Sequence, residues 1–132
     1  MDLETELLKE ASKRQALKIA NIIGDDQEQF AKLIMIFLNG TYRLTQRAAW
    51  VLSICVDAHP GLLDSHLKAI VENLEKPDLH DAVKRNTVRF LQNIEIPEDL
   101  MGTVANVCFE YLGSNEPVAI KVFDKVIFKL PV

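Results

Sequence analysis

Residues 45–60, TQRAAWVLSICVDAHP, form an apolar-periodic segment that ends at a proline. Residues 80–92, HDAVKRNTVRFLQ, repeat this pattern at an offset of 38, so that Arg47 corresponds to Arg85 and Leu52 to Phe90. The segments that follow are duplicated too, since apolar positions 67, 70, 71 and 74 align with 105, 108, 109 and 112. A helix pair that recurs in this way predicts a helical repeat domain, because one pair cannot bury its apolar faces alone.

Glycines and prolines divide the rest of the chain into short helices. The breaks fall at Gly24, Gly40, Pro60, Pro77, Pro97 and Pro117. Proline fits the first turn of a helix but not its interior, so each break separates two elements. We expect helices over residues 3–23, 26–38, 42–58, 61–75, 79–94, 98–112 and 117–130. A strand remains an alternative for residues 118–122, although the spacing of polar residues after Val118 favours a helix.

The two duplicated stretches resemble HEAT and armadillo repeats, and the chain is similar to small bacterial repeat proteins. The resemblance covers roughly residues 12–130. It implies an all-α fold, a right-handed α-α superhelix of about three helix pairs, in a single domain over residues 1–132. In this family an outer helix and an inner helix form each pair, and the inner helices line a concave surface. Carried over, the inner helices are 26–38, 61–75 and 98–112, and the outer helices are 42–58, 79–94 and 117–130.

Charge divides unequally between these two layers. The inner helices and their flanking turns hold ten acidic and three basic residues, whereas the rest of the chain holds nine acidic and twelve basic residues. An acidic concave surface favours a basic peptide or protein segment as ligand. The side chains expected on that surface recur at an offset of 36 to 38 and are Glu28, Lys32, Asp64, Lys68, Glu72, Asn106 and Glu110. We call these seven residues the predicted stripe.

No motif for catalysis or metal binding is present in the sequence. It contains no GxSxG, Walker, GxGxxG or HExxH pattern, and His59, His66 and His80 lack the spacing of metal ligands. The carboxylate pairs at 25–26 and 98–99 stand where helices begin, where acidic side chains stabilise the helix. We therefore expect a non-catalytic, protein-binding scaffold with no cofactor and no metal. An enzyme of another kind stays an alternative.

Nucleic-acid binding is the second alternative, because some DNA-repair glycosylases are built from HEAT-like repeats. The basic residues expected on the outer helices are Arg43, Arg47, Lys84, Arg85 and Arg89. A net charge of −4 and an acidic inner layer argue against phosphate binding. We expect Arg47 and Arg85 to pair with carboxylates of neighbouring repeats instead. The aromatic residues expected in the core are Trp50, Phe90, Phe109 and Tyr111.

The amino terminus and the cysteines indicate a cytoplasmic protein. The first residues form an acidic amphipathic segment without the features of a secretory signal, and the longest apolar run, 33–38, is too short to cross a bilayer. Cys55 and Cys108 lie within apolar stretches, so we expect both to be buried free thiols.

The last expected helix, 117–130, is apolar over most of its circumference. Exposing such a surface to water is unfavourable, so it needs a cover. Three arrangements would provide one: a homodimer through Phe123, Ile127 and Phe128, a longer solenoid, or the amino-terminal helix of the same chain.

Overall fold

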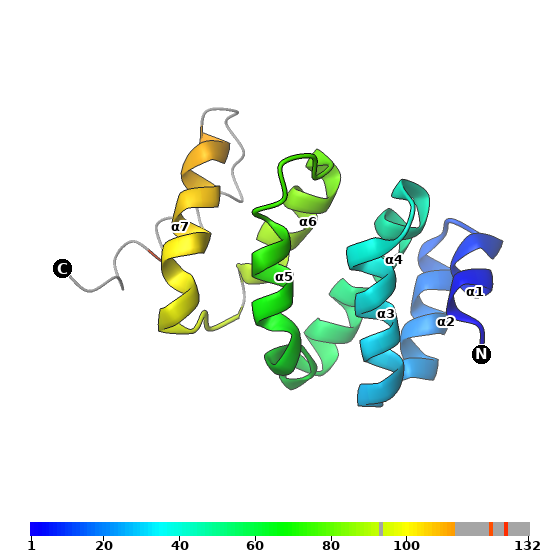
Figure 1. Ribbon diagram of the computed structural model, residues 1–132. Helices are drawn as coiled ribbons and strands as arrows, with labels where there is room; N and C mark the ends of the chain where they lie inside the picture. Colours follow the sequence, from blue (N-terminus) through cyan, green and yellow to red (C-terminus); the bar gives the residue numbers. More distant parts are fainter. Residues whose placement is uncertain (93, 113–121, 123–125, 127–132) are drawn as a thin grey trace. The chain divides into compact units, whose positions relative to one another are not determined.

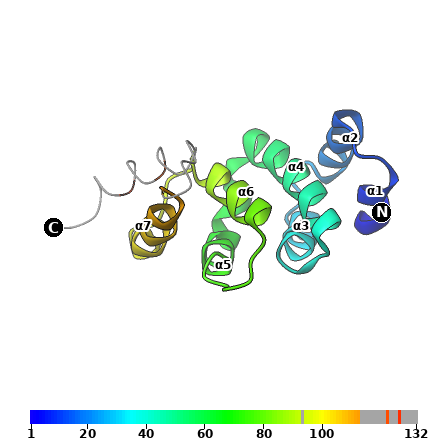
Figure 2. The ribbon, with the colours of Figure 1, turned by 90° about the horizontal axis from the view of Figure 1, so that it is seen from above.

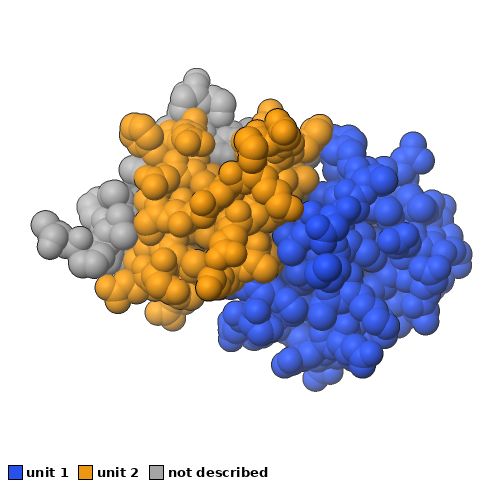
Figure 3. All heavy atoms as spheres, viewed as in Figure 1, with its two compact units in different colours: residues 1–67 blue, residues 68–132 orange. Residues whose placement is uncertain are grey.

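The computed structural model describes residues 1–92, 94–112, 122 and 126, without the side chains of residues 82, 111 and 112. The chain divides into two compact units, Met1–Leu67 and Lys68–Val132 (Figure 3). The regular elements of the described residues are all helical, which confirms the predicted all-α fold.

Unit 1 holds four α-helices and a 3-10 helix. They are α1 (Leu3–Lys9), α2 (Lys13–Ile23), α3 (Gln27–Asn39), α4 (Tyr42–Ala58) and the 3-10 helix η1 (Pro60–His66). Helix α4 packs against α1, α2, α3 and η1, so it is the centre of this unit. Helices α1 and α3 lie in one layer, and α2 and α4 lie in the other (Figures 1 and 2).

The core of unit 1 follows from the periodicity of its helices. On α3 the fully buried residues Phe30, Leu33 and Phe37 stand three and four positions apart, and on α4 Ala48 and Leu52 stand four apart. Each of the larger side chains stabilises the fold by about 1.5–3 kcal/mol when it leaves water. One face of α3 and one face of α4 are therefore buried in the core, and the opposite face of each helix is exposed to solvent.

Unit 2 contains the second duplicated pair. Its helices are α5 (Leu67–Asn73, which begins at the last residue of unit 1), α6 (Asp81–Leu91) and α7 (Glu98–Leu112). Helices α5 and α7 lie in one layer and α6 in the other (Figure 2). Its core includes Ile70, Val71, Leu91, Val104 and Cys108, all completely buried.

Side-chain caps fix the starts of the first three helices. Asp2 accepts a hydrogen bond from the Thr5 backbone N–H, and Asp26 accepts from Glu28 and Gln29 N–H groups at 2.9 and 3.2 Å. Such caps satisfy backbone donors that have no partner within the helix. The expected capping role of the 25–26 pair is confirmed at Asp26.

The prediction of one helix over 3–23 was wrong at its centre. Glu10 has an extended backbone after α1, and Ser12 begins α2 by accepting a hydrogen bond from the Gln15 N–H at 3.1 Å. Gln15 then donates from Nε2 to the carbonyl oxygen of Glu6 at 2.8 Å. Carbonyls at the end of a helix lack intrahelical partners, so this bond from α2 compensates for the break.

Two further helix boundaries differ from the prediction. The segment 61–75 begins as the 3-10 helix η1, with Pro60 in its first turn, and becomes α-helical at Leu67. The helix expected over 79–94 extends only over Asp81–Leu91, and the buried Ile94 and Ile96 lie beyond its end. These apolar residues carried the helical pattern past the true end of the helix. The helices over 42–58 and 98–112 have the predicted bounds.

The expected helix over 117–130 lies almost entirely outside the described residues. Val122 and Val126 are helical and buried. Phe123, Ile127 and Phe128, the residues predicted for self-association, are outside the described part of the chain. The dimer therefore stays a prediction.

The prediction of four core aromatic residues was wrong for Trp50 and Phe109. Trp50 is 43% exposed, because it stands about 200° around α4 from the buried Ala48. Phe109 is 66% exposed, since it follows the exposed Asn106 by three positions on α7. Phe90 is buried as predicted, and the side chain of Tyr111 is outside the described residues.

Candidate protein-binding site

The exposed face of α3 carries the first residues of the predicted stripe. Glu28 and Lys32 are exposed and stand four residues apart, opposite the buried Phe30 and Leu33. Met35 continues the same face and is 59% exposed, the highest exposure of any large apolar side chain on this helix. The α3 surface thus combines charged groups with one large apolar side chain.

The third member of the stripe lies in the same unit. Asp64 is exposed on η1, and η1 packs against α3. Two residues further along the chain, His66 is half-buried, with its ring centroid 5.7 Å from that of Phe30. This tilted contact joins η1 to α3 within unit 1.

In unit 2, α5 supplies two charged residues of the stripe. Lys68 and Glu72 form an ion pair at 4.0 Å, with their side chains 75% and 58% exposed. An exposed pair one helical turn apart contributes only about 0.3–0.5 kcal/mol. An incoming charged group can therefore displace either partner at little cost.

The remaining stripe residues, Asn106 and Glu110, are exposed on α7 and border a cleft. The cleft has a volume of about 390 Å³. Its walls come from the turn after α5, from α6 and from α7; its lining residues are Leu74, Glu75, Lys76, Pro77, Lys84, Thr103, Asn106, Val107 and Glu110. We call it the unit 2 cleft. The repeat pattern did not predict it, because the turn at 74–77 has no regular periodicity that would indicate which side chains face α7.

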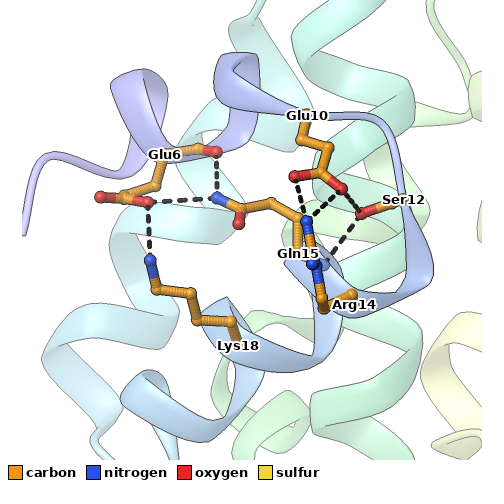
Figure 4. A network of polar contacts seen from close by, with 6 residues as sticks. All are labelled: Glu6, Glu10, Ser12, Arg14, Gln15 and Lys18. Carbon is orange, nitrogen blue, oxygen red and sulfur yellow. Dashed lines mark hydrogen bonds and ion pairs between the residues drawn. The ribbon is translucent and has the colours of Figure 1, made fainter.

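The carboxylates of the predicted stripe differ from those at the amino terminus in their pairing. Among the described residues, no ion-pair partner contacts Glu28, Asp64 or Glu110. By contrast, Glu6 accepts from Lys9 at 2.8 Å. Glu6 also lies 3.8 Å from Lys18, and Glu10 pairs with Arg14 (Figure 4).

These amino-terminal contacts also change the acidity of the carboxylates. The hydrogen bond from Lys9 is the main cause that lowers the pKa of Glu6, and the hydrogen bond from Ser12, followed by that from Arg14, lowers the pKa of Glu10. Their charge is thus already engaged within the chain. Within the described residues, Glu28, Asp64 and Glu110 have no such ion pair, so they are available to an outside cation.

Comparison with known proteins identifies the fold family. A family model described as a HEAT repeat domain matches residues 3–126. The chain belongs to this HEAT repeat family. Comparisons with curated proteins and with solved structures gave no match. HEAT repeat domains are helical scaffolds that commonly mediate protein interactions and are typically non-catalytic.

Arg47, a basic residue of the outer helix α4 in this HEAT repeat chain, contacts the backbone of α1. Arg47 of α4 donates from Nη1 to the carbonyl oxygen of Leu7 at 3.0 Å, so its predicted pairing with a carboxylate was wrong. The reason is that α1 ends beside α4, where its last carbonyls need donors. Arg47 is therefore a structural residue that holds α1.

Basic and apolar side chains of α2 form a shallow surface along this helix. It is lined by Lys13, Arg14, Leu17, Lys18, Asn21 and Ile22. Two of its cations are compensated, because Arg14 pairs with Glu10 and Lys18 lies 3.8 Å from Glu6. This compensation makes α2 a weaker phosphate-binding surface than its sequence indicates.

The described part of the HEAT repeat chain contains no group of three potential metal ligands. Cys55 and Cys108 are buried, which confirms the predicted burial, and burial raises the pKa of each thiol to about 11. A thiol with so high a pKa is a poor nucleophile near neutral pH. Among the described helices, none has the length and apolar character needed to span a membrane.

Proposed function

We propose that this HEAT repeat chain is a non-catalytic scaffold that binds a basic peptide or protein segment along the predicted stripe. The observation that supports the proposal most directly is the state of Glu28, Asp64 and Glu110. All three carboxylates are exposed, and none has an ion-pair partner among the described residues. A basic segment would supply the missing cations.

The expected interaction is electrostatic and depends on salt. Each new exposed ion pair contributes roughly 0.2–1 kcal/mol, so several are needed for measurable affinity. Exposed pairs are screened over about 10 Å at 0.1 M salt. Affinity should therefore fall steeply as ionic strength rises.

The exposed face of α3 carries an apolar side chain as well as charged ones. Met35 lies one turn beyond Lys32 on the same exposed face, and a flexible methionine adapts well to varied apolar partners. Apolar side chains that become buried at the centre of an interface carry much of its binding energy. The ligand we propose is thus a basic segment with at least one large apolar residue among its cations.

Fluorescence anisotropy with a labelled peptide of alternating lysine and leucine tests the proposal. An acidic peptide of equal length, with glutamate in place of lysine, is the control ligand. We expect saturable binding of the basic peptide at roughly 50 mM salt, and at least tenfold weaker binding at roughly 300 mM. Equal affinity for the two peptides, or binding that does not change with salt, would contradict the electrostatic mechanism.

Two triple variants with the same change in charge locate the site. The first is Glu28→Gln/Asp64→Asn/Glu110→Gln, in the predicted stripe. The second is Glu4→Gln/Asp57→Asn/Glu95→Gln, which neutralises three exposed carboxylates elsewhere. The first variant should weaken peptide binding roughly tenfold, and the second less than threefold. Equal losses would mean that net charge, and not the stripe, determines binding.

The nucleic-acid alternative is tested in the same experiment with duplex DNA as the third ligand. The compensated cations of α2 predict no saturable binding near physiological salt. DNA binding that persists at that salt concentration would favour the alternative over the scaffold.

A further inference from the structure

One face of α2 carries two large apolar side chains in contact with solvent. The helix packs against α1 and α4, and Leu17 and Ile22 are nevertheless 39% and 51% exposed. The shallow hollow along this face has a volume of about 750 Å³ and is lined by α2 alone, through Lys13, Arg14, Leu17, Lys18, Asn21 and Ile22. A shallow strip along one helix fits a second helix better than a small molecule, which needs a concave pocket.

Charge changes sign from one end of this helix to the other. Lys13 and Arg14 stand at the start of α2, which contains no acidic residue. Asp25 and Asp26 follow its last turn directly, and both are exposed. The backbone carbonyls at the end of a helix add a partial negative charge there. The surface is thus basic at its start and acidic at its end, with apolar side chains in between.

This order of charges is complementary to itself when two copies of α2 pack antiparallel. The register that places Leu17 opposite Ile22 of the second copy also places Arg14 opposite Asp25 and Lys13 opposite Asp26. Lys18 then stands opposite the neutral Asn21. Because the relation is reciprocal, each of these contacts occurs twice about a two-fold axis. A parallel arrangement would instead place cations opposite cations.

The charged groups at both ends of α2 are available for such contacts. Among the described residues, Lys13 and Asp25 have no ion-pair partner. Arg14 pairs with Glu10 at 3.0 Å (Figure 4), but the Arg14 side chain is 84% exposed. An exposed pair one helical turn apart is weak, so a carboxylate of a second copy can compete for this guanidinium.

We propose that two copies of the chain associate as a two-fold dimer through antiparallel α2 helices. The α2 dimer goes beyond the scaffold function and does not depend on it, because the predicted stripe lies on other helices. A contact between two helices of 11 residues each is smaller than a standard stable interface, so the dimer should be weak. We expect a Kd of roughly 10–100 µM.

Sedimentation equilibrium of the full chain over roughly 5–500 µM tests the α2 dimer. Leu17→Ser/Ile22→Ser should raise the Kd at least about tenfold, because it removes the apolar centre of the interface. Leu8→Ser/Met35→Ser is the matched control, since it changes two apolar side chains of α1 and α3 that are 47% and 59% exposed. The control should raise the Kd less than about threefold. A chain that is monomeric at roughly 500 µM, or equal effects of the two variants, would overturn the inference.

Two charge reversals test the antiparallel register. In its own dimer, Arg14→Glu opposes carboxylates to carboxylates and Asp25→Lys opposes cations to cations, so each variant alone should dimerise at least about tenfold more weakly. An equimolar mixture of the two should form a heterodimer with about the unmodified Kd, because each reversed charge then meets its opposite on the other chain. No recovery in the mixture would overturn the inference.

Matched controls for the mixture carry the same changes elsewhere. Arg43→Glu and Asp57→Lys alter exposed residues of α4 and should leave the Kd unchanged, alone or mixed. Circular dichroism establishes that all variants are folded. Recovery in a mixture of these controls with the α2 variants would show that net charge, and not the register, determines association, and would overturn the inference.

The α2 dimer and the scaffold fail in distinguishable ways. Peptide binding without self-association refutes only the dimer, and self-association without peptide binding refutes only the scaffold. Dimerisation that is lost in Glu28→Gln/Asp64→Asn/Glu110→Gln would overturn the α2 dimer, because the basic face of α2 would then bind the predicted stripe of a second copy. Dimerisation that persists unchanged in Leu17→Ser/Ile22→Ser would overturn it in favour of the predicted contact through Phe123, Ile127 and Phe128.

Discussion

Asn73 ends α5 with its side chain buried and without hydrogen bonds. It is 4% exposed, and neither Nδ2 nor Oδ1 has a hydrogen-bond partner in the part of the chain that the structure describes. A buried polar group without a partner costs about 1–3 kcal/mol, and it is one place where a sequence departs from the rules of core packing. The repeat pattern gave no indication of it, since an asparagine near a helix end normally faces solvent.

Replacement of this residue by Asn73→Leu should therefore stabilise the protein by about 1–2 kcal/mol, because an apolar group of similar size removes the unpaired atoms. Urea denaturation followed by circular dichroism measures the change. Asn73→Asp is the matched control and should destabilise, since it buries a charge. A loss of stability in Asn73→Leu would show that the amide makes hydrogen bonds in solution.

Gly40 and Gly102 predict opposite effects of the same substitution. A Cβ at Gly40 would lie 2.5 Å from the Ile36 carbonyl oxygen, whereas a Cβ at Gly102 meets nothing within 4 Å. Gly40→Ala should cost about 1–3 kcal/mol through the backbone clash. Gly102→Ala, within α7, should stabilise by about 0.5–1 kcal/mol. Gly61→Ala, also without close contacts, is the control within unit 1, and a loss there as large as at Gly40 would contradict the steric cause.

At the level of the element, the sequence predicted long periodic helices well and short irregular segments poorly. Helices α4 and α7 have the predicted bounds because their apolar residues recur without interruption between clear breaks. The gap between α1 and α2 was missed although the apolar spacing changes across it: on one continuous helix Leu7 and Ala16 would lie about 180° apart, yet both are buried. Ser12, a favourable first residue for a helix, also indicated the break.

The contacts between α1 and α2 predict a dependence on pH. The pKa of Glu6 and that of Glu10 are lowered in the folded chain by hydrogen bonds from Lys9 and Ser12 respectively. Carboxylates with a lowered folded pKa stabilise the protein above their unfolded pKa, and this contribution is lost as pH falls through the folded value. The free energy of unfolding of unit 1 should therefore decrease below about pH 4.5, the ordinary value for glutamate.

Trp50, the single tryptophan, lines a small pocket of unit 1 together with Glu10 and Ser12, so its fluorescence reports unfolding of this region. Glu6→Gln/Glu10→Gln should show a smaller decrease in stability between about pH 5 and pH 3 than the unmodified chain. Glu4→Gln, an exposed change on α1, serves as the comparison. Parallel acid profiles for the double variant and the unmodified chain would contradict the role of these two carboxylates.

At the scale of the whole molecule, the family and the all-α fold were predictable, and the arrangement of the site was only partly so. The offset of 36 to 38 selected seven side chains that are all exposed, because a repeat places equivalent residues on equivalent helix faces. It could not select Met35 or the unit 2 cleft. Exposure of an apolar residue and the course of a turn depend on packing between helices, which periodicity within one helix does not encode.

The most direct test of the scaffold proposal uses the three methionines as reporters. Met35 is exposed on α3, one turn after Lys32 of the predicted stripe, Met101 is buried in α7, and Met1 is exposed at the amino terminus. Methyl NMR of the chain labelled at methionine follows all three during titration with the lysine and leucine peptide. We predict a saturable shift of the Met35 resonance that is reversed by salt, with Met1 and Met101 unchanged. Peptide binding that shifts Met1 and leaves Met35 unchanged would contradict the account.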